Sequence, residues 1–392
     1  MRFTPRSELM VRISKLQQAM SDAGFDGIVI AQNADLFYFA GTVRQSNLYV
    51  PASGVPVLMV RKSLDRAREE SNLGEIVPLS NLKEMPNVLA SYGYRNLGVL
   101  GFEMDVLPVA LFMRYQKILP SARLADASEL IKRVKMVKSA YEINLMKEAA
   151  KINQVIFSRV RDYLREGITE IELAGKLELL SRQMGNQGYI RMRGFNQEMA
   201  FYVISGPNLA EPSYLDTPIS GTGLNVSLPQ GAGYRKIQVN EPVMLDYGGA
   251  FDGYIVDQTR TYCIGRLPEK MTRAYETAIS IQEELKQKAV PGVLCKDLYA
   301  LAVDIANQAD LGNHFMGYSD AVHFVGHGVG IELDEWPVLA KRFNIPLEEG
   351  MVMAIEPKFV FPEGAVGIEN TFVVRNNGLE TITEFDEGII YL

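Results

Sequence analysis

The chain has 392 residues and a net charge of −7 at pH 7, with 47% apolar and 22% charged residues. Its length predicts two domains, and its composition is typical of a soluble globular protein. The acidic balance argues against nucleic-acid binding, which needs clustered Lys and Arg to neutralise phosphates. The sequence has no apolar signal segment and no run near the ~18 apolar residues of a membrane span. With two cysteines giving no disulfide framework, we expect a cytoplasmic protein that does not bind membranes.

The first third of the chain alternates helical patterns with short apolar runs. Residues 7–24 carry apolar side chains at helical spacing and end near a glycine. Short apolar runs typical of buried strands follow, at 27–31, 36–41, 55–60 and 97–102. Helix-like stretches lie between these runs, at about 62–71 and 106–118. The alternation predicts an α/β domain with a mixed sheet over residues 1–130, and the absence of a catalytic motif indicates a scaffold or partner-contacting role.

A charged helical stretch near residues 125–138 marks the expected boundary to a second domain over residues 131–392. Beyond it, Ser139 and Thr169 are each followed three residues later by glutamate. This spacing is that of a capping box and predicts helices that begin at about 140 and 170. Further helical patterns occur at about 268–289 and 295–309, and the remainder is rich in strands.

A first predicted hairpin, over residues 243–262, carries two aspartates. Its expected turn contains Asp252 and Gly253, a dipeptide typical of tight hairpin turns. A turn centred on 251/252 would place Asp246 directly opposite Asp257, whereas a turn centred on 252/253 would make them diagonal neighbours. Both registers place the two carboxylates on one face, roughly 5–8 Å apart. Carboxylates this close repel each other unless a cation lies between them, and a metal ion would serve.

A second predicted hairpin repeats this arrangement with glutamates. Glu356 and Glu369 flank a turn at Pro362-Glu363-Gly364 and lie in otherwise apolar strands. Burying an unpaired carboxylate costs several kcal/mol, so both glutamates need a compensating partner. Either hairpin alone could simply have a polar outer face. Two such hairpins with a histidine between them favour a metal site instead.

The histidine is His327, which lies in the glycine-rich segment GHGVG. The flanking glycines permit close backbone approach beside the imidazole. A lone histidine is more often a core residue than a ligand, and His327 gains weight only from the four acids. Four carboxylates with one imidazole form an oxygen-rich set suited to Mn, Co, Fe or Zn, and the lack of thiolates argues against a structural zinc site.

At this level the sequence resembles the pita-bread metallopeptidases, a family that includes methionine aminopeptidase, aminopeptidase P, prolidase and creatinase. The motifs that carry the resemblance are Asp246-Tyr247-Gly248, Asp257-Gln258-Thr259-Arg260-Thr261, His323-x-x-x-His327-Gly328, Ile355-Glu356-Pro357 and Ile368-Glu369. The first domain and the following linker are similar to the creatinase and prolidase arrangement in particular. The resemblance implies an α/β N-terminal domain followed by an α+β pita-bread C-terminal domain.

The resemblance also implies a site and an assembly. Two divalent metal ions would be bridged by Asp257 and Glu369, with Asp246 holding one ion and His327 and Glu356 the other. It implies a homodimer acting on a small peptide or amide substrate.

Three departures from the peptidase pattern concern substrate contacts. Gln230 stands where the peptidases have a histidine in a Leu-Pro-His-Gly-like segment, and Asp334 stands where they have a second histidine. Gly367 stands where prolidases and aminopeptidase P have an arginine. Gln230 can donate a hydrogen bond but cannot titrate, and an anionic Asp334 would repel an oxyanion and attract a cation. We therefore expect inefficient hydrolysis of ordinary Xaa-Pro peptides.

The leading hypothesis is a dinuclear metallohydrolase of C–N bonds, similar to Xaa-Pro dipeptidases and aminopeptidase P. Glu356 would accept or relay a proton, and His323 would act as a relay behind the metal ligands. Asp334 and Gln230 would contact the substrate. The alternatives are creatinase-like, metal-free hydrolysis or lyase chemistry, and a non-catalytic binding protein of the same fold. Metal content discriminates among these possibilities.

Overall fold

The computed structural model describes residues 2–199, 201–212 and 214–392. The chain divides into two compact units, Met1–Lys135 with Gly194–Asn196, and Met136–Arg193 with Gln197–Leu392. Each unit is described by itself. Among the described residues, no helix combines the length and the apolar character needed to cross a membrane.

The N-terminal unit is built on a six-stranded mixed sheet with the order β4-β3-β2-β1-β5-β6. Its strands are β1 (Gly27–Ile30), β2 (Ser46–Pro51), β3 (Val57–Val60), β4 (Glu75–Pro78), β5 (Val99–Phe102) and β6 (Arg123–Asp126). The antiparallel pairs are β1 with β2 and β2 with β3, and the other neighbours are parallel. Its helices are α1 (Arg6–Ala23), α2 (Asn33–Ala40), α3 (Leu64–Glu70), η1 (Leu82–Glu84), α4 (Met85–Ser91), α5 (Val109–Ile118) and α6 (Ser128–Met136). The predicted mixed α/β sheet is confirmed.

One predicted element of this unit is wrong. The apolar run 36–41 was expected to be a strand, but most of it belongs to helix α2. The side chain of Gln32 caps this helix by accepting a hydrogen bond from the backbone NH of Asp35, and Gly41 ends it in the left-handed conformation at φ 72°. The helix is buried on nearly every side, so polar and apolar residues do not recur along it at helical spacing. Such a short apolar run cannot be distinguished from a buried strand by its sequence pattern.

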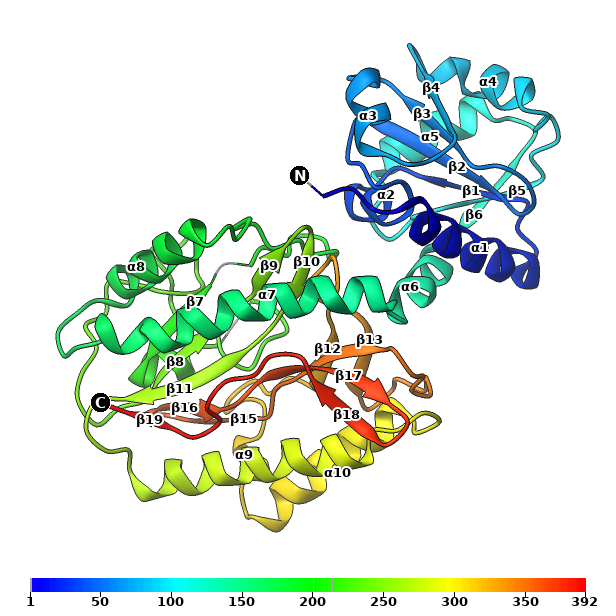
Figure 1. The fold of residues 1–392 in the computed structure, drawn as a ribbon. Helices are drawn as coiled ribbons and strands as arrows, with labels where there is room; N and C mark the ends of the chain where they lie inside the picture. Colours follow the sequence, from blue (N-terminus) through cyan, green and yellow to red (C-terminus); the bar gives the residue numbers. More distant parts are fainter. Residues whose placement is uncertain (1, 200, 213) are drawn as a thin grey trace. The chain divides into compact units, whose positions relative to one another are not determined.

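The C-terminal unit contains four long helices and two larger sheets (Figure 1). The helices are α7 (Ala140–Arg159), α8 (Glu170–Gln183), α9 (Glu269–Lys288) and α10 (Cys295–Gln308), with short turns η2 (Val160–Asp162), η3 (Gly206–Ala210) and η4 (Gly312–His314). One sheet has the order β19-β11-β8-β7, with strands β7 (Tyr202–Ser205), β8 (Val243–Asp246), β11 (Thr259–Cys263) and β19 (Ile390–Tyr391). The other has the order β13-β12-β14-β17-β18, with strands β12 (Phe324–Gly328), β13 (Glu335–Ala340), β14 (Val352–Ile355), β17 (Asn370–Arg375) and β18 (Gly378–Thr381).

Two short ribbons complete this unit and extend its hairpins. They consist of β9 (Gly249–Phe251) with β10 (Tyr254–Val256), and β15 (Lys358–Phe361) with β16 (Gly364–Gly367). Helix α7 packs on β9 and β10, whereas α9 packs on β15, β16 and β18 (Figure 1). The helices thus hold two ribbons that are flanked in sequence by the motif acids Asp246, Asp257, Glu356 and Glu369.

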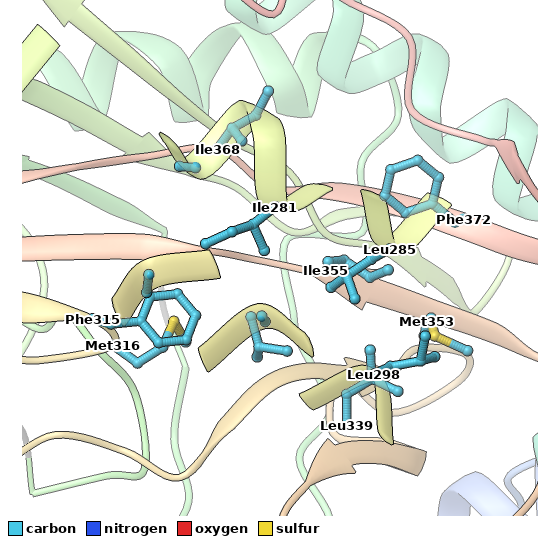
Figure 2. Close-up of a cluster of buried hydrophobic side chains, with 14 of the residues drawn as sticks. Ile281, Leu285, Leu298, Phe315, Met316, Leu339, Met353, Ile355, Ile368 and Phe372 are labelled. Carbon is cyan, nitrogen blue, oxygen red and sulfur yellow. The ribbon is translucent and has the colours of Figure 1, made fainter. Parts of the chain in front are cut away.

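The main core of the C-terminal unit joins α9 and α10 to the larger sheet. Figure 2 shows Ile281 and Leu285 of α9 and Leu298 of α10 near Ile355 and Phe372 of the strands. All five side chains are at most 1% exposed. Burial of this kind stabilises the fold by about 1.5–3 kcal/mol per large aliphatic or aromatic side chain. The core fixes β14 and β17, which end beside Glu356 and Glu369.

Both predicted capping boxes are confirmed. At the start of α7, the hydroxyl of Ser139 accepts a hydrogen bond from the backbone NH of Glu142, and the carboxylate of Glu142 accepts one from the backbone NH of Ser139. Thr169 and Glu172 repeat the arrangement at the start of α8.

Replacing Ser139 by alanine is expected to lower the free energy of unfolding by about 1 kcal/mol, because it removes the cap of a long helix with one buried face. Urea unfolding of the two proteins measures the difference. Ser158→Ala, an exposed serine near the other end of α7, is the matched control and should change stability by less than about 0.5 kcal/mol. Equal losses in both variants would contradict a capping role.

Candidate metal and active site

The first hairpin adopts the second of the two predicted registers. Asp246 at the end of β8 pairs with Thr259 of β11, so Asp257 is its diagonal neighbour. The turn between β9 and β10 contains Asp252 and Gly253, both with positive φ, at 45° and 89°. A two-residue turn of this kind matches the right-handed twist of the paired strands. The register therefore places both aspartates on one face.

The second hairpin brings the two glutamates directly opposite each other. Ile355 pairs with Asn370, and Lys358 pairs with Gly367, so one continuous register runs through both pairs. Glu356 and Glu369 lie opposite each other in this register, between the two ribbons. His327 joins them from the neighbouring strand β12, where it pairs with Ala354.

The four acids and His327 line one pocket in the C-terminal unit. Each of the five is at most 7% exposed. Burial raises the pKa of Asp257 well above its ordinary value, and the neighbouring carboxylates of Glu369 and Asp246 raise it further. Burial also raises the pKa of Asp246, against the opposing effect of Lys358. Carboxylates this deeply buried need cations beside them.

The hydrogen bonds of His327 orient its ring for ligation. Its Nδ1 lies 3.2 Å from the carbonyl oxygen of Gly328 and 3.1 Å from that of Leu333. A carbonyl oxygen can only accept, so Nδ1 carries the proton of the neutral ring and Nε2 keeps its lone pair. Backbone carbonyls that fix the outer nitrogen in this way are typical of metal-ligating histidines.

The Nε2 atom of His327 faces one oxygen of each of three acids. It lies 4.0 Å from Asp257 Oδ2, 3.7 Å from Glu356 Oε1 and 3.8 Å from Glu369 Oε1. Two ligands bonded to one ion at 2.0–2.2 Å can be at most about 4.4 Å apart, so these separations are compatible with a shared ion. Glu369 Oε1 is also buried without a hydrogen-bond partner. Asp257, His327 and Glu369, whose ligand atoms all lie within 4.8 Å of one another, therefore fit a divalent metal ion.

A residue that sequence reasoning missed contacts three of these acids from within the protein, without lining the pocket itself. The side chain of Lys358 is fully buried, and its Nζ donates to Glu356 Oε2 at 2.5 Å, Glu369 Oε2 at 3.1 Å and Asp246 Oδ2 at 3.2 Å. Burial lowers the pKa of Lys358, but these three carboxylates outweigh burial and hold the pKa well above its ordinary value. Lys358 is therefore an ammonium ion within the acid cluster. Its position two residues after Glu356 on an extended strand was the available signal, because side chains two apart point to the same face.

Sequence and structure comparisons agree with this geometry. The family described as metallopeptidase family M24 matches residues 144–376, more than half of the chain, and the family described as creatinase/prolidase N-terminal domain matches residues 12–137. The chain belongs to metallopeptidase family M24. It is thereby an enzyme of the metallohydrolase class, and the predicted family is confirmed.

Individual relatives of this M24 enzyme cover nearly the whole chain. The Xaa-Pro dipeptidase of Pyrococcus horikoshii is 27% identical over 97% of this chain and 98% of its own length. A solved structure titled Xaa-Pro dipeptidase from Bacillus anthracis superposes with a TM-score of 0.84 at 26% identity, covering 98% of this chain and all of that one. The prolidase from Pyrococcus horikoshii gives a TM-score of 0.80 at 25% identity, with 97% and 100% covered. The predicted fold, an α/β N-terminal domain followed by a pita-bread domain, is confirmed.

The three predicted substrate or relay residues of this M24 enzyme have different surroundings. Asp334 lines the acid pocket, is 43% exposed at its side chain, and places Oδ1 3.4 Å from Nδ1 of His327. Burial lowers the pKa of His327, but Asp334 and the two glutamates, Glu356 and Glu369, together raise it above its ordinary value.

Gln230 is not among the residues that line this pocket. Its amide NH₂ donates to the carbonyl oxygen of Glu198 at 2.7 Å, and its amide oxygen accepts from the hydroxyl of Tyr202 at 3.0 Å. Both ends of the amide are thus committed to the protein, and Tyr202 lines the pocket instead. Gln230 thus holds the hydroxyl of Tyr202, and its own predicted contact with the substrate stays a prediction.

His323 is not brought into the pocket either. It precedes strand β12, and four residues of extended chain span about 13 Å. The spacing of four would make His323 and His327 neighbours on a helix, but on a strand it separates them. The strand geometry therefore does not place His323 beside His327, and the relay role stays a prediction.

Proposed function

We propose that this M24 enzyme hydrolyses the C–N bond of a small peptide-like substrate, with Xaa-Pro dipeptides and their cationic relatives as the substrate class. The observation that supports this proposal is the convergence of three carboxylate oxygens on Nε2 of His327 in a pocket. The Xaa-Pro dipeptidases among its relatives support the substrate class.

The metal is proposed as a divalent ion of the Mn, Co, Fe or Zn group, held by Asp257, His327 and Glu369. When bound, such an ion lowers the pKa of a water molecule and polarises the scissile carbonyl. Glu356 is proposed as the proton acceptor. Its Oε2 accepts a hydrogen bond from the ammonium of Lys358, which holds the carboxylate in place. Its Oε1 lies 3.7 Å from Nε2 of His327. The geometry thus leaves one oxygen of Glu356 available to take a proton.

Asp334 is proposed to select substrates with a positive charge. Its carboxylate lines the pocket and is 43% exposed, so a bound substrate can reach it. A cationic group there would gain a charge-assisted hydrogen bond, whereas an oxyanion would be repelled.

We expect Lys-Pro and Arg-Pro to be hydrolysed with higher kcat/KM than Leu-Pro, and Asp334→Asn to remove this preference. The loss for the cationic dipeptides should be about tenfold, equivalent to ~1.4 kcal/mol, because the variant keeps the shape of the side chain but not its charge. Steady-state assays of the three dipeptides on both proteins measure it. A second variant, Asp334→His, introduces the imidazole that the peptidase pattern has at this position. Its kcat/KM should be higher for Leu-Pro than for the cationic dipeptides. Wild-type kcat/KM that is equal or higher for Leu-Pro would contradict the selection.

Metal-free, creatinase-like hydrolysis is a second candidate, because Lys358 already supplies a cation to the carboxylates. Exhaustive chelation distinguishes the two. The first proposal predicts loss of activity that Mn²⁺ restores, and the second predicts activity without bound metal. Cyclic amidines, N-acyl amino acids and guanidino compounds complete the substrate panel for the second candidate.

The cytoplasmic location and the homodimer remain proposals from the sequence and the resemblance. Light scattering of the purified protein tests the dimer.

A further inference from the structure

The side chain of Lys358 reaches the acid cluster because the residue opposite it has no side chain. Lys358 pairs with Gly367 across the β15–β16 ribbon. A Cβ atom added to Gly367 would lie 2.7 Å from Cγ of Lys358 and 2.6 Å from the carbonyl oxygen of Pro357. Any other residue at position 367 would therefore displace the lysine. Gly367 is also the position at which the resemblance predicted an arginine. The departure from the peptidase pattern and the buried ammonium therefore lie directly opposite each other across the ribbon.

The ammonium divides the carboxylate oxygens into two groups. On its own side are Glu356 Oε2, Glu369 Oε2 and Asp246 Oδ2, all within 3.2 Å of Nζ. Glu369 Oε2 accepts a further hydrogen bond from the hydroxyl of Thr259 at 2.7 Å. These three oxygens already have a cation at hydrogen-bonding distance, although its single positive charge offsets only part of their negative charge.

The second group of oxygens faces His327. Asp257 Oδ2, Glu356 Oε1 and Glu369 Oε1 lie 3.7–4.0 Å from its Nε2. Thus Glu356 and Glu369 each give one oxygen to the ammonium and turn the other toward the imidazole. Asp257 gives its other oxygen, Oδ1, to the backbone NH of Gln258 at 2.9 Å. Asp246 Oδ1 is also buried without a hydrogen-bond partner. Among the described residues, however, the His327 side is where a ring nitrogen lies beside carboxylate oxygens that no ammonium engages.

From this division we propose that the ammonium of Lys358 takes the place of one of the two metal ions, so that the enzyme binds a single divalent ion on the His327 side. The displaced ion is the one that Asp246 would hold, because Asp246 Oδ2 is engaged by Nζ. Four carboxylates carry four negative charges, and one divalent ion with one ammonium supplies three positive charges. A second divalent ion beside the ammonium would place two cations within the span of one carboxylate, where their repulsion is strong. This inference rests on the proposed metal-dependent function.

Metal stoichiometry tests the proposal without an activity assay. The chelator-treated full-length protein is titrated with MnCl₂ by calorimetry, and bound metal is measured by elemental analysis. We expect one equivalent per chain for the wild type and two for Lys358→Ala, which removes both the charge and the bulk from the Asp246 side. Electron paramagnetic resonance should show an isolated Mn²⁺ in the wild type and an exchange-coupled pair in Lys358→Ala.

Lys135→Ala is the matched control, because it removes another buried ammonium, paired with Asp35 at 3.0 Å, from the N-terminal unit. It should bind one equivalent, as the wild type does. Two bound equivalents of Mn²⁺ per wild-type chain would overturn the proposal, and so would none. The wild-type measurement is decisive by itself, whether or not the variant folds. One equivalent in folded Lys358→Ala would also overturn it, because the lysine would then not be what excludes the second ion. Single-ion binding without hydrolysis of any dipeptide would instead refute the proposed function and leave the inference standing.

Discussion

Replacing His327 by alanine is expected to abolish detectable Mn²⁺ binding and to lower kcat/KM on the order of 10³-fold, equivalent to ~4 kcal/mol. His327 supplies the nitrogen ligand of the candidate site, and its Nε2 faces three carboxylate oxygens at 3.7–4.0 Å. The ring is held by the carbonyl oxygens of Gly328 and Leu333, and an alanine at this position offers neither these contacts nor a nitrogen ligand. Titration calorimetry and steady-state kinetics on a fast dipeptide measure both effects.

His314→Ala is the control for this experiment. His314 donates from Nδ1 to the carbonyl oxygen of Val360 and stacks on Tyr318, and it does not line the acid pocket. Its loss should leave metal affinity and kcat/KM within about threefold, in line with the small effects of most substitutions away from a site. A His327→Ala protein that keeps its circular dichroism spectrum and still binds Mn²⁺ with wild-type affinity would refute the ligand assignment.

Replacing Lys358 by methionine is expected to lower the free energy of unfolding of the metal-free protein by about 3–5 kcal/mol, the range measured when one partner of a buried ion pair is removed. The methionine keeps most of the buried volume of the lysine, so the change isolates the charge. Without it, the carboxylates of Asp246, Glu356 and Glu369 face one another with no cation between them. Urea unfolding in the presence of chelator measures the loss.

The same variant should regain more stability from Mn²⁺ than the wild type does, because a bound ion that neutralises these carboxylates binds only the folded state. Lys138→Met is the matched control, since it removes a buried ammonium that lies 3.0 Å from Glu335 in the same unit. It should lose stability but show no enhanced response to Mn²⁺. Equal responses in the two variants would show that the loss at Lys358 reflects packing alone.

Much of the site could be predicted from local sequence patterns because strand pairing has a period of two. The Asp252-Gly253 turn limits the first hairpin to two registers, and both leave Asp246 and Asp257 on one face. The pairing of Glu356 with Glu369 follows in the same way from the turn between β15 and β16. The capping boxes at Ser139 and Thr169 were equally readable, since each involves residues only three positions apart.

His323 and Gln230 do not line the pocket, and the reason lies in three-dimensional distances that cannot be derived from the sequence. Whether His323 reaches the acids is decided by β12 being a strand and not a helix. Gln230 faces Glu198 and Tyr202, partners about thirty positions away, so no local pattern could indicate that both ends of its amide are engaged. Helix α2 was missed because a fully buried helix and a buried strand have the same apolar composition.

Residue types and their spacing indicated the five candidate ligands, because each lies in a motif within a single hairpin or strand. Those motifs also carried the resemblance to the family. Only the tertiary structure decided which cation meets those ligands. Lys358 became part of the site because its strand pairs with a glycine, which leaves the space through which its side chain reaches carboxylates from three separate strand ends. The charge of a buried acid cluster is compensated by whichever cation lies close to it in space. The sequence does not give these distances, so the role of a lysine two residues after a predicted ligand could be seen only in the folded chain.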